Sequence, residues 1–267
     1  MKTKLYALAL VVFFFACKES PKDKILIPTP LTGTEDFNTY PKNPEDVLKL
    51  VKVVDQEAAK PEALMSIKFK DSLMKIQPDP KDKAFLKEGF ALAEMINTQQ
   101  TCALVQITGS VAAQAPFFLI AVKNGQAVAS SLYRASNGAG DEQFTKGMIR
   151  VGKSGYLINN DYFITTVNAK VFEIKRQRED ERIQGQYFMN SKDKTTLVFL
   201  TKDSFYQVHY PTGTVYNAPL PKKAPREVAN IYKYIQDNYR WVKNGKGIEF
   251  LQYVDNNVIV DMTRKFK

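Results

Sequence analysis

The sequence contains very few of the side chains that most often bind metals or form disulfides. His209 is the single histidine among 267 residues, which excludes histidine-rich metal sites and the paired histidines of zinc proteases. The two cysteines, Cys17 and Cys102, are too few for the disulfide framework of a small secreted domain. Trp241 is the single tryptophan, so the stacked tryptophans common in sugar-binding sites are lacking too. We expect neither a metal nor a cofactor.

Long apolar runs and charge of one sign are also lacking. The longest run in the N-terminal region covers the 12 residues 5–16, whereas a membrane-spanning helix needs about 20. The formal net charge is +10, but the lysines and arginines are interspersed with acids instead of gathering in one stripe, so no nucleic-acid partner is expected. Hydrophobic residues make up 44% of the chain, which is enough to form a folded core.

The first 17 residues have the organisation of an export signal. Lys2 and Lys4 precede the apolar run, and the small residue Ala16 precedes Cys17. This stretch resembles the signal of bacterial lipoproteins, in which the cysteine receives a diacylglyceryl thioether, becomes the mature N-terminus and is then N-acylated. Phe14 departs from that pattern, because leucine is usual three residues before the cysteine. An ordinary secretory signal with an incidental cysteine is the alternative.

The resemblance implies that the acylated Cys17 holds the chain on the lipid bilayer of the bacterial cell envelope, at the outer membrane. Removal of residues 1–16 would lower the formal net charge from +10 to +8, because the two lysines of the signal leave with it. Residues 17–41 are expected to form a lipidated N-terminus and a flexible tether, since polar residues and the prolines Pro28 and Pro30 interrupt any regular element.

Residues 42–267 are expected to form a single α+β domain that begins with two helices. The first helix is predicted from Asn43 as its N-cap, Pro44 at the first helical position and the apolar stripe that follows. Apolar residues at helical spacing predict the second helix over 81–97. Both helices fall within residues 42–98, and their apolar stripes should dock on a sheet.

The next segment, residues 101–217, has a strand-like pattern. Short apolar runs alternate with turn signals, of which Asn124-Gly125 is the strongest. Turns this close together leave no room for crossover helices between strands. The segment therefore predicts an antiparallel β-meander that forms a curved sheet or a partial barrel.

The C-terminal segment, residues 225–264, is predicted to contain one helix and one hairpin. Apolar residues at helical spacing cover 228–242, and an Asn-Gly pair shortly after them provides a stop. The hairpin is expected to join residues 248–254 to residues 258–262.

Residues 147–155 match the pattern G-x-x-x-x-G-K-[ST] of phosphate-binding loops. Such a loop follows a buried strand and opens a helix, whose N-terminus holds the phosphates. Here the strand-like residues 156–158 follow the match instead. We therefore interpret residues 152–155 as a hairpin turn and expect no nucleotide to bind at Lys153.

Several other features would suit a catalyst, but each is incomplete. Ser72 and Lys75 fit the S-x-x-K motif of penicillin-binding enzymes, and residues 153–155 fit their K-[ST]-G element, yet no S-x-N element lies between them. His209 could act as a general base, although a structural histidine in a strand is the commoner case. Cys102 lies in an apolar stretch, where it is expected to be a small buried side chain and not a nucleophile.

The tyrosines of the meander are a candidate binding surface, because tyrosine is a frequent contact residue. They are Tyr187, Tyr206, Tyr210 and Tyr216. Cross-strand packing is the other interpretation. Together with the signal, they predict a membrane-anchored envelope lipoprotein that acts as a binding or scaffold module for a small apolar ligand or a protein partner. The alternative is an envelope hydrolase that uses Ser72/Lys75 or His209.

Overall fold

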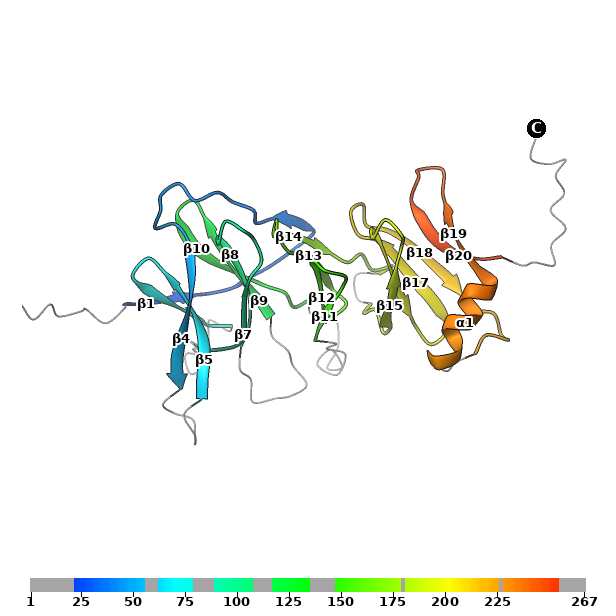
Figure 1. Cartoon of the computed structure of the whole chain (residues 1–267), viewed down its shortest axis with the longest axis horizontal. Helices are drawn as coiled ribbons and strands as arrows, with labels where there is room; N and C mark the ends of the chain where they lie inside the picture. Colours follow the sequence, from blue (N-terminus) through cyan, green and yellow to red (C-terminus); the bar gives the residue numbers. More distant parts are fainter. Residues whose placement is uncertain are drawn as a thin grey trace, which may run out of the picture.

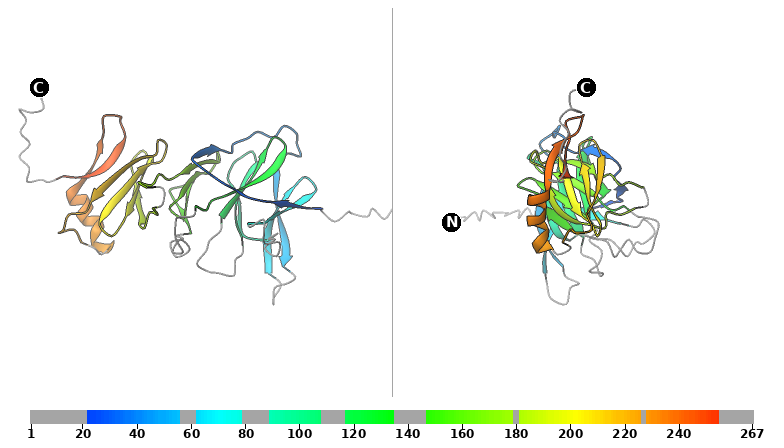
Figure 2. Two further views of the ribbon diagram at one scale, coloured as in Figure 1. Left: turned by 180° about the vertical axis from the view of Figure 1, so that it is seen from behind. Right: turned by 90° about the vertical axis from the view of Figure 1, so that its right-hand side faces the viewer.

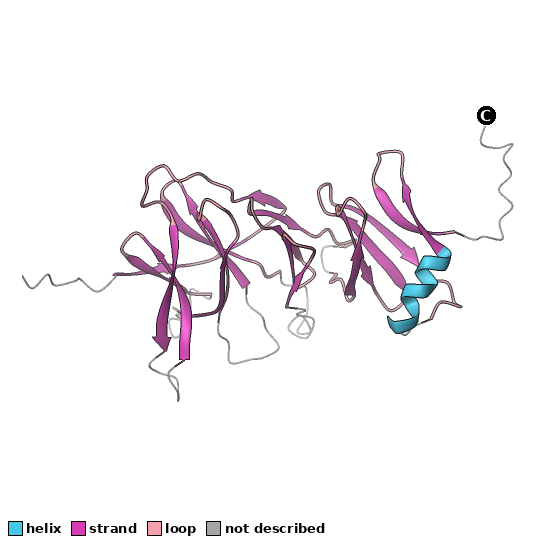
Figure 3. Ribbon diagram, viewed as in Figure 1, coloured by secondary structure: helices cyan, strands magenta, loops and turns pink. Residues whose placement is uncertain are grey.

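The computed structural model of this chain is mostly β. It describes residues 22–55, 62–78, 89–107, 117–134, 147–178, 181–225 and 228–254. Within these segments the chain forms many strands and a single helix, α1, near the C-terminus (Figure 3). The expected strands and C-terminal helix are confirmed, whereas the two N-terminal helices of the expected α+β domain are wrong. The signal residues 1–16 and Cys17 lie outside the described residues.

The N-terminal half of the chain builds a sheet of nine strands, which curls into a half-barrel (Figure 1). Its strands follow the order β1-β6-β5-β7-β8-β9-β10-β2, and β4 pairs with β5 beside this path. The bounds are β1 Lys22–Leu26, β2 Thr29–Pro30, β4 Leu48–Asp55, β5 Glu62–Phe69, β6 Ser72–Ile76, β7 Phe90–Met95, β8 Cys102–Ile107, β9 Phe117–Lys123 and β10 Gln126–Ser131.

Three smaller sheets follow along the long axis of the molecule (Figures 1 and 2). The five-stranded sheet contains β11 Met148–Arg150, β12 Gly155–Ile158, β13 Tyr162–Thr165, β14 Lys170–Glu173 and β3 Thr34–Asp36. The four-stranded sheet contains β15 Gln186–Asn190, β16 Thr196–Leu200, β17 Ser204–His209 and β18 Thr214–Pro219. The last elements are α1 Val228–Asn238 and the hairpin of β19 Tyr239–Lys243 and β20 Glu249–Tyr253.

Strands β12 of the five-stranded sheet and β16 of the four-stranded sheet have both faces buried, which explains their uninterrupted apolar sequences. In β12, Tyr156 and Ile158 pack toward the nine-stranded sheet, whereas Leu157 packs toward the four-stranded sheet. In β16, Phe199 packs toward the five-stranded sheet and Val198 toward α1. Successive side chains of a strand point to opposite faces, so each inner sheet joins two cores. Four hydrophobic clusters, separated by the sheets, therefore follow one another from the half-barrel to the C-terminal helix.

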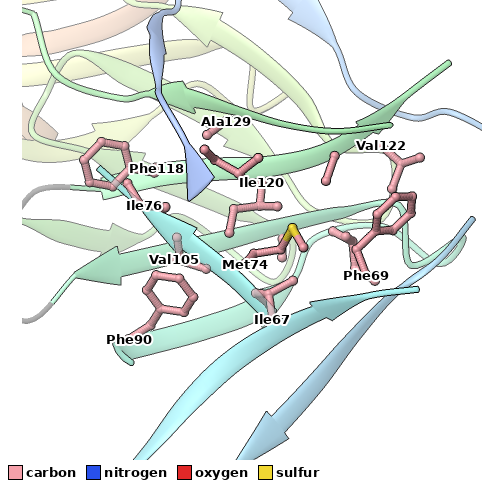
Figure 4. Close-up of a cluster of buried hydrophobic side chains, with 14 of the residues drawn as sticks. Ile67, Phe69, Met74, Ile76, Phe90, Val105, Phe118, Ile120, Val122 and Ala129 are labelled. Carbon is pink, nitrogen blue, oxygen red and sulfur yellow. The ribbon is translucent and has the colours of Figure 1, made fainter. Parts of the chain in front are cut away.

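The inside of the half-barrel is filled by aliphatic and aromatic side chains from most of its strands. Ile67, Met74 and Ile76 are fully buried, and Phe90 is 1% exposed. Figure 4 shows these side chains meeting Val105 and others from the opposite wall. The half-barrel thus encloses a packed hydrophobic core.

Residues 22–36, which the sequence assigns to a flexible tether, are tied to three places in the fold. Strand β1 pairs in parallel with β6, β2 pairs in parallel with β10, and β3 pairs with β14 of the five-stranded sheet. Leu26 and Leu31 are 5% and 2% exposed, so this segment also contributes to the core. The tether prediction is wrong here because burial of these leucines stabilises an ordered segment despite its prolines. Pro30 lies in an edge strand, where its missing N–H is tolerated. We call residues 22–36 the N-terminal strap.

The residues expected in the first helix form strand β4. Its valines are β-branched and favour extended backbone, and all eight residues of the strand find partners in β5. The expected capping residues form a turn instead. The Asp46 carboxylate accepts hydrogen bonds from the backbone N–H and the side-chain amide of Asn43, at 3.2 and 2.9 Å.

The described part of the second expected helix forms strand β7. The sequence FALAEM has a high helix propensity, but it pairs with β8, with a bulge between Phe90 and Leu92. Burial of Phe90 in the half-barrel, which requires a strand here, overrides the local preference. Residues 81–88 lie outside the described residues.

Helix α1 ends at Asn238, four residues earlier than predicted. The next residues are rich in aromatic side chains and form β19, so Trp241 lies on a strand. Arg240 Nη1 donates to the carbonyl of Gln236 at 2.8 Å, which satisfies a carbonyl of the last turn. Strand β20 pairs with β19, and the expected hairpin strand 258–262 lies outside the described residues.

The strongest predicted turn of the meander, Asn124-Gly125, is confirmed. Asn124 and Gly125 have φ values of 51° and 73° and join β9 to β10 as a tight hairpin. Consecutive strands pair antiparallel from β11 to β14 and again from β15 to β18. Among the described residues, no helix has the length and apolar character that a membrane span requires.

Candidate functional site

A pocket of about 360 Å³ opens beside the turn between β16 and β17. It lies between the end of the four-stranded sheet and the segment that leads to α1. Its lining residues are Leu200, Thr201, Lys202, Asp203, Leu220 and Pro225. The volume falls in the range of about 300–1,000 Å³ typical of small-molecule sites.

Backbone hydrogen bonds fix both walls of this pocket. The Thr201 N–H donates to the Ser204 carbonyl at 2.9 Å, and the Ser204 N–H donates to the Thr201 hydroxyl at 3.0 Å. The Leu220 N–H donates to the Asp203 carbonyl at 2.8 Å, which joins the segment after β18 to the turn. These backbone groups are therefore satisfied, and the pocket offers mainly side chains to a ligand.

The lining has an apolar part and a charged part. Leu200, Leu220 and Pro225 supply apolar surface, while Lys202 and Asp203 supply one charge of each sign. Such a lining suits a small apolar group that carries a polar or charged end. The sequence carries no signal for this site, because its residues come from a turn and a connecting segment that have no apolar period.

Three of the four candidate tyrosines lie between two sheets and do not form an open surface. Tyr210 packs on Phe163 and Phe172, with ring centroids 4.3 and 4.9 Å apart. Tyr206 is 4% exposed and donates its hydroxyl to a backbone carbonyl at 2.9 Å. Tyr187 packs beside Phe199, and burial raises the pKa of its hydroxyl to about 12. All three belong to the core between the five-stranded and four-stranded sheets.

Tyr216 faces the other side of the four-stranded sheet. It is 39% exposed and packs on Phe250 of β20, with ring centroids 5.4 Å apart. Tyr216 is therefore not brought together with Tyr187, Tyr206 and Tyr210. The arrangement of these tyrosines is that of packing between strands and layers.

A buried charge cluster lies where the sheets meet. Asp161, in the turn between β12 and β13, is 1% exposed. Its carboxylate accepts hydrogen bonds from Arg176 at 2.7 Å and Arg134 at 3.1 Å. Arg182 Nη1 lies 3.7 Å from the same carboxylate, and Arg134 also pairs with Glu173.

This cluster joins elements that are far apart in sequence. Arg134 follows β10 of the nine-stranded sheet, Asp161 belongs to the five-stranded sheet, and Arg182 precedes the four-stranded sheet. Glu173 also accepts a hydrogen bond from the Gly33 N–H of the N-terminal strap at 2.7 Å. Because a buried carboxylate is costly unless it is paired, the cluster fixes how these elements meet. We assign it a structural role.

His209 lies at the end of β17, beside a group of hydroxyl side chains. Its Nδ1 is 2.7 Å from the Thr212 hydroxyl, which in turn is 2.8 Å from the Thr214 hydroxyl. Partial burial lowers the pKa of His209, and the charge of Asp193 acts in the opposite direction. Within the described residues no carboxylate is hydrogen-bonded to the ring, so the orienting acid of a catalytic triad is not in place.

The other catalytic candidates are also separated. Ser72 and Lys75 lie three positions apart on strand β6, which places them on opposite faces of the sheet. Lys75 pairs with Asp23 at 2.9 Å. Cys102 is fully buried, and burial raises the pKa of its thiol, which leaves it a poor nucleophile.

The segment that matches the phosphate-loop pattern is a β-hairpin, as predicted. Strands β11 and β12 pair antiparallel on either side of residues 151–154, and the Val151 N–H donates to the Gly155 carbonyl at 2.9 Å. Gly152 has φ of 67°, which the turn requires. No helix follows the loop, so the feature that holds phosphates is missing here.

In the part of the chain that the structure describes, no group of three or more potential metal ligands comes together. Comparison with known proteins gives no relative, since no family model, curated protein or solved structure matches the chain.

Proposed function

We propose that this chain is a lipid-anchored lipoprotein of the bacterial cell envelope that acts as a binding module. The acylated Cys17 holds it on the outer membrane. Its four-stranded sheet takes up a small apolar ligand or an apolar group of a protein partner. The observation that carries the anchor is the apolar run of residues 5–16, which ends with Ala16 directly before Cys17.

The position of the N-terminal strap supports this arrangement. Strand β1 begins at Lys22, so four residues separate it from Cys17. A fully extended chain spans about 3.5 Å per residue, so β1 would start within roughly 18 Å of the anchored cysteine. Strand β1 lies at one end of the long axis of the molecule, and α1 lies at the other end (Figures 1 and 2). The half-barrel would then lie next to the bilayer, and the four-stranded sheet would lie further away from it.

The pocket beside the β16–β17 turn supports the binding part of the proposal. It belongs to the sheet that would lie far from the bilayer, where partners and ligands of the envelope have access. Its apolar residues Leu200 and Leu220 and its charged residues Lys202 and Asp203 match the mixed lining of small-ligand sites.

The anchor is tested by metabolic labelling of the full-length chain with an alkyne analogue of palmitate. We expect label on the wild-type protein and none on the Cys17→Ala variant. The wild type should remain with membranes, because two or more acyl chains give stable attachment where one does not. Equal label on both proteins would contradict the anchor.

The binding module is tested by photo-crosslinking in living cells. A photoreactive amino acid replaces Lys202 at the pocket, and a matched control carries it at Lys192, which is exposed in another turn of the same sheet. We expect a specific adduct from position 202 and none from position 192. Identical adducts at both positions, or no adduct at either, would contradict a binding role of the pocket.

A further inference from the structure

The outer surface of the nine-stranded sheet carries a group of lysines close to the start of β1. Strand register places Lys68 opposite Lys49 on one side and opposite Leu73 on the other. On the other side of β6, β1 places Asp23 opposite Leu73 and Ile25 opposite Lys75. Residues in register share one face of a sheet. We call this group the outer lysine face, and its members are Asp23, Ile25, Lys49, Lys68, Leu73 and Lys75.

The alternate residues of the same strands show that this face points away from the core. Leu26 of β1, Ile67 of β5 and Met74 of β6 are buried inside the half-barrel, so Ile25, Lys68, Leu73 and Lys75 lie on the opposite face of the sheet. Ile25 is accordingly 49% exposed, and Lys49 is exposed. The face therefore offers both positive charge and an accessible aliphatic side chain.

The charges of this face are not balanced within it. Lys75 pairs with Asp23 at 2.9 Å, and Lys68 lies 3.8 Å from the fully exposed Asp71 at the edge of the face. Lys49 has no ion pair within the described residues and lies directly opposite Lys68. Like charges directly opposite each other destabilise a strand pair, so an anion beside them would be favourable.

We propose that the outer lysine face rests on the bilayer that holds Cys17. The lysines contact anionic lipid headgroups, and Ile25 reaches the apolar boundary beneath them. This rests on the proposed lipid anchor, which ends four residues before β1 and so keeps this face within reach of the headgroups. Basic residues beside an apolar side chain are the combination that binds an anionic membrane surface.

The test uses the unacylated chain 18–267, which keeps every residue that the structure describes. Its sedimentation is measured with vesicles of phosphatidylcholine alone and with vesicles that contain one quarter phosphatidylglycerol. We expect binding to the anionic vesicles that weakens when salt is raised. Lys49→Gln and Lys68→Gln should each weaken it roughly fivefold, the effect of about 1 kcal/mol per charge at such a surface. Ile25→Ser should weaken it further.

A matched control removes two exposed lysines far from this face, with Lys153→Gln and Lys246→Gln, and should bind like the wild type. Thermal melts show whether each variant is folded. Equal binding to both kinds of vesicle, or equal binding by the wild type and the Lys49→Gln and Lys68→Gln variants, would overturn the proposal. Recovery of an envelope protein through these lysines without vesicle binding would overturn it as well. Because this chain carries no acyl group, a failure here is separate from a failure of the Cys17 labelling.

Discussion

Replacement of Leu26 by alanine should destabilise the whole protein if residues 22–36 form a strap. Leu26 is 5% exposed and packs inside the half-barrel, and its carbonyl accepts a hydrogen bond from the Gln77 N–H at 3.0 Å. The next residue, Ile27, is 54% exposed. Ile27→Ala is therefore a matched control in the same segment.

The size of the effect follows from the burial of Leu26. Loss of three carbon atoms at about 0.8 kcal/mol each, together with a cavity, costs about 2.7–5.0 kcal/mol at fully enclosed sites. Since Leu26 lies on an edge strand, where neighbours can partly close the gap, we expect about 2–3 kcal/mol. The control should stay within about 0.5 kcal/mol. In a chain of this length the difference lowers Tm by roughly 4–12 °C.

Urea unfolding of the chain 18–267 measures this difference directly. The midpoint of Leu26→Ala should fall while the slope of the transition stays that of the wild type, because the native and unfolded states keep their compactness. If Leu26→Ala unfolds at the same urea concentration as Ile27→Ala, the segment is a tether after all and the strap is refuted.

Three further changes test other parts of the fold. Ile235→Ala should cost about 2–5 kcal/mol, because this residue of α1 is 4% exposed in the C-terminal core; an unchanged Tm would show that the helix is not packed there. Asp161→Asn should cost about 3–5 kcal/mol in urea unfolding, because it removes the buried negative charge that accepts hydrogen bonds from Arg134 and Arg176, and a loss below 1 kcal/mol would contradict the role of the cluster. His209 has a folded pKa below its ordinary 6.5, so its contribution to stability is complete above about pH 6.5 and is lost as pH falls through the folded pKa. His209→Gln should therefore flatten the decline of Tm below pH 6.5, and an unchanged slope would contradict this.

Elements with a local signal in the sequence were predicted correctly. The Asn124-Gly125 turn needs positive φ at both positions, and few other dipeptides provide it. The hairpin at residues 152–155 follows from the strand-like residues on both sides. The stripe of α1 was found because Ile231 and Ile235 occupy one face of a helix.

Local signals in the sequence mislead where pairing and burial in the folded sheet decide the conformation. Strand β7 has the composition of a helix, and only its pairing with β8 and the burial of Phe90 make it a strand. The N-terminal strap owes its conformation to β6, β10 and β14, whose paired residues lie about 50–140 residues further along the chain. A local window around the strap contains none of these three strands.

The candidate site shows the same limit. Tyr206 and Tyr210 looked like a surface because aromatic residues favour both interfaces and cores, and the sequence does not reveal that a second sheet covers them. The pocket next to Lys202 is made by two segments about 20 residues apart, which meet only after β17 and β18 have paired. The connections of Asp161 to three arginines likewise appear only in the folded chain.

The intact mass of the full-length protein, purified from membranes with detergent, tests the lipid anchor most directly. Our account predicts a chain that begins at Cys17 and carries the added mass of a diacylglyceryl group and an N-linked acyl chain, with the Cys17→Ala variant lacking both. An unmodified N-terminus that begins at another residue, or a wild-type mass with no acyl groups, would contradict the account.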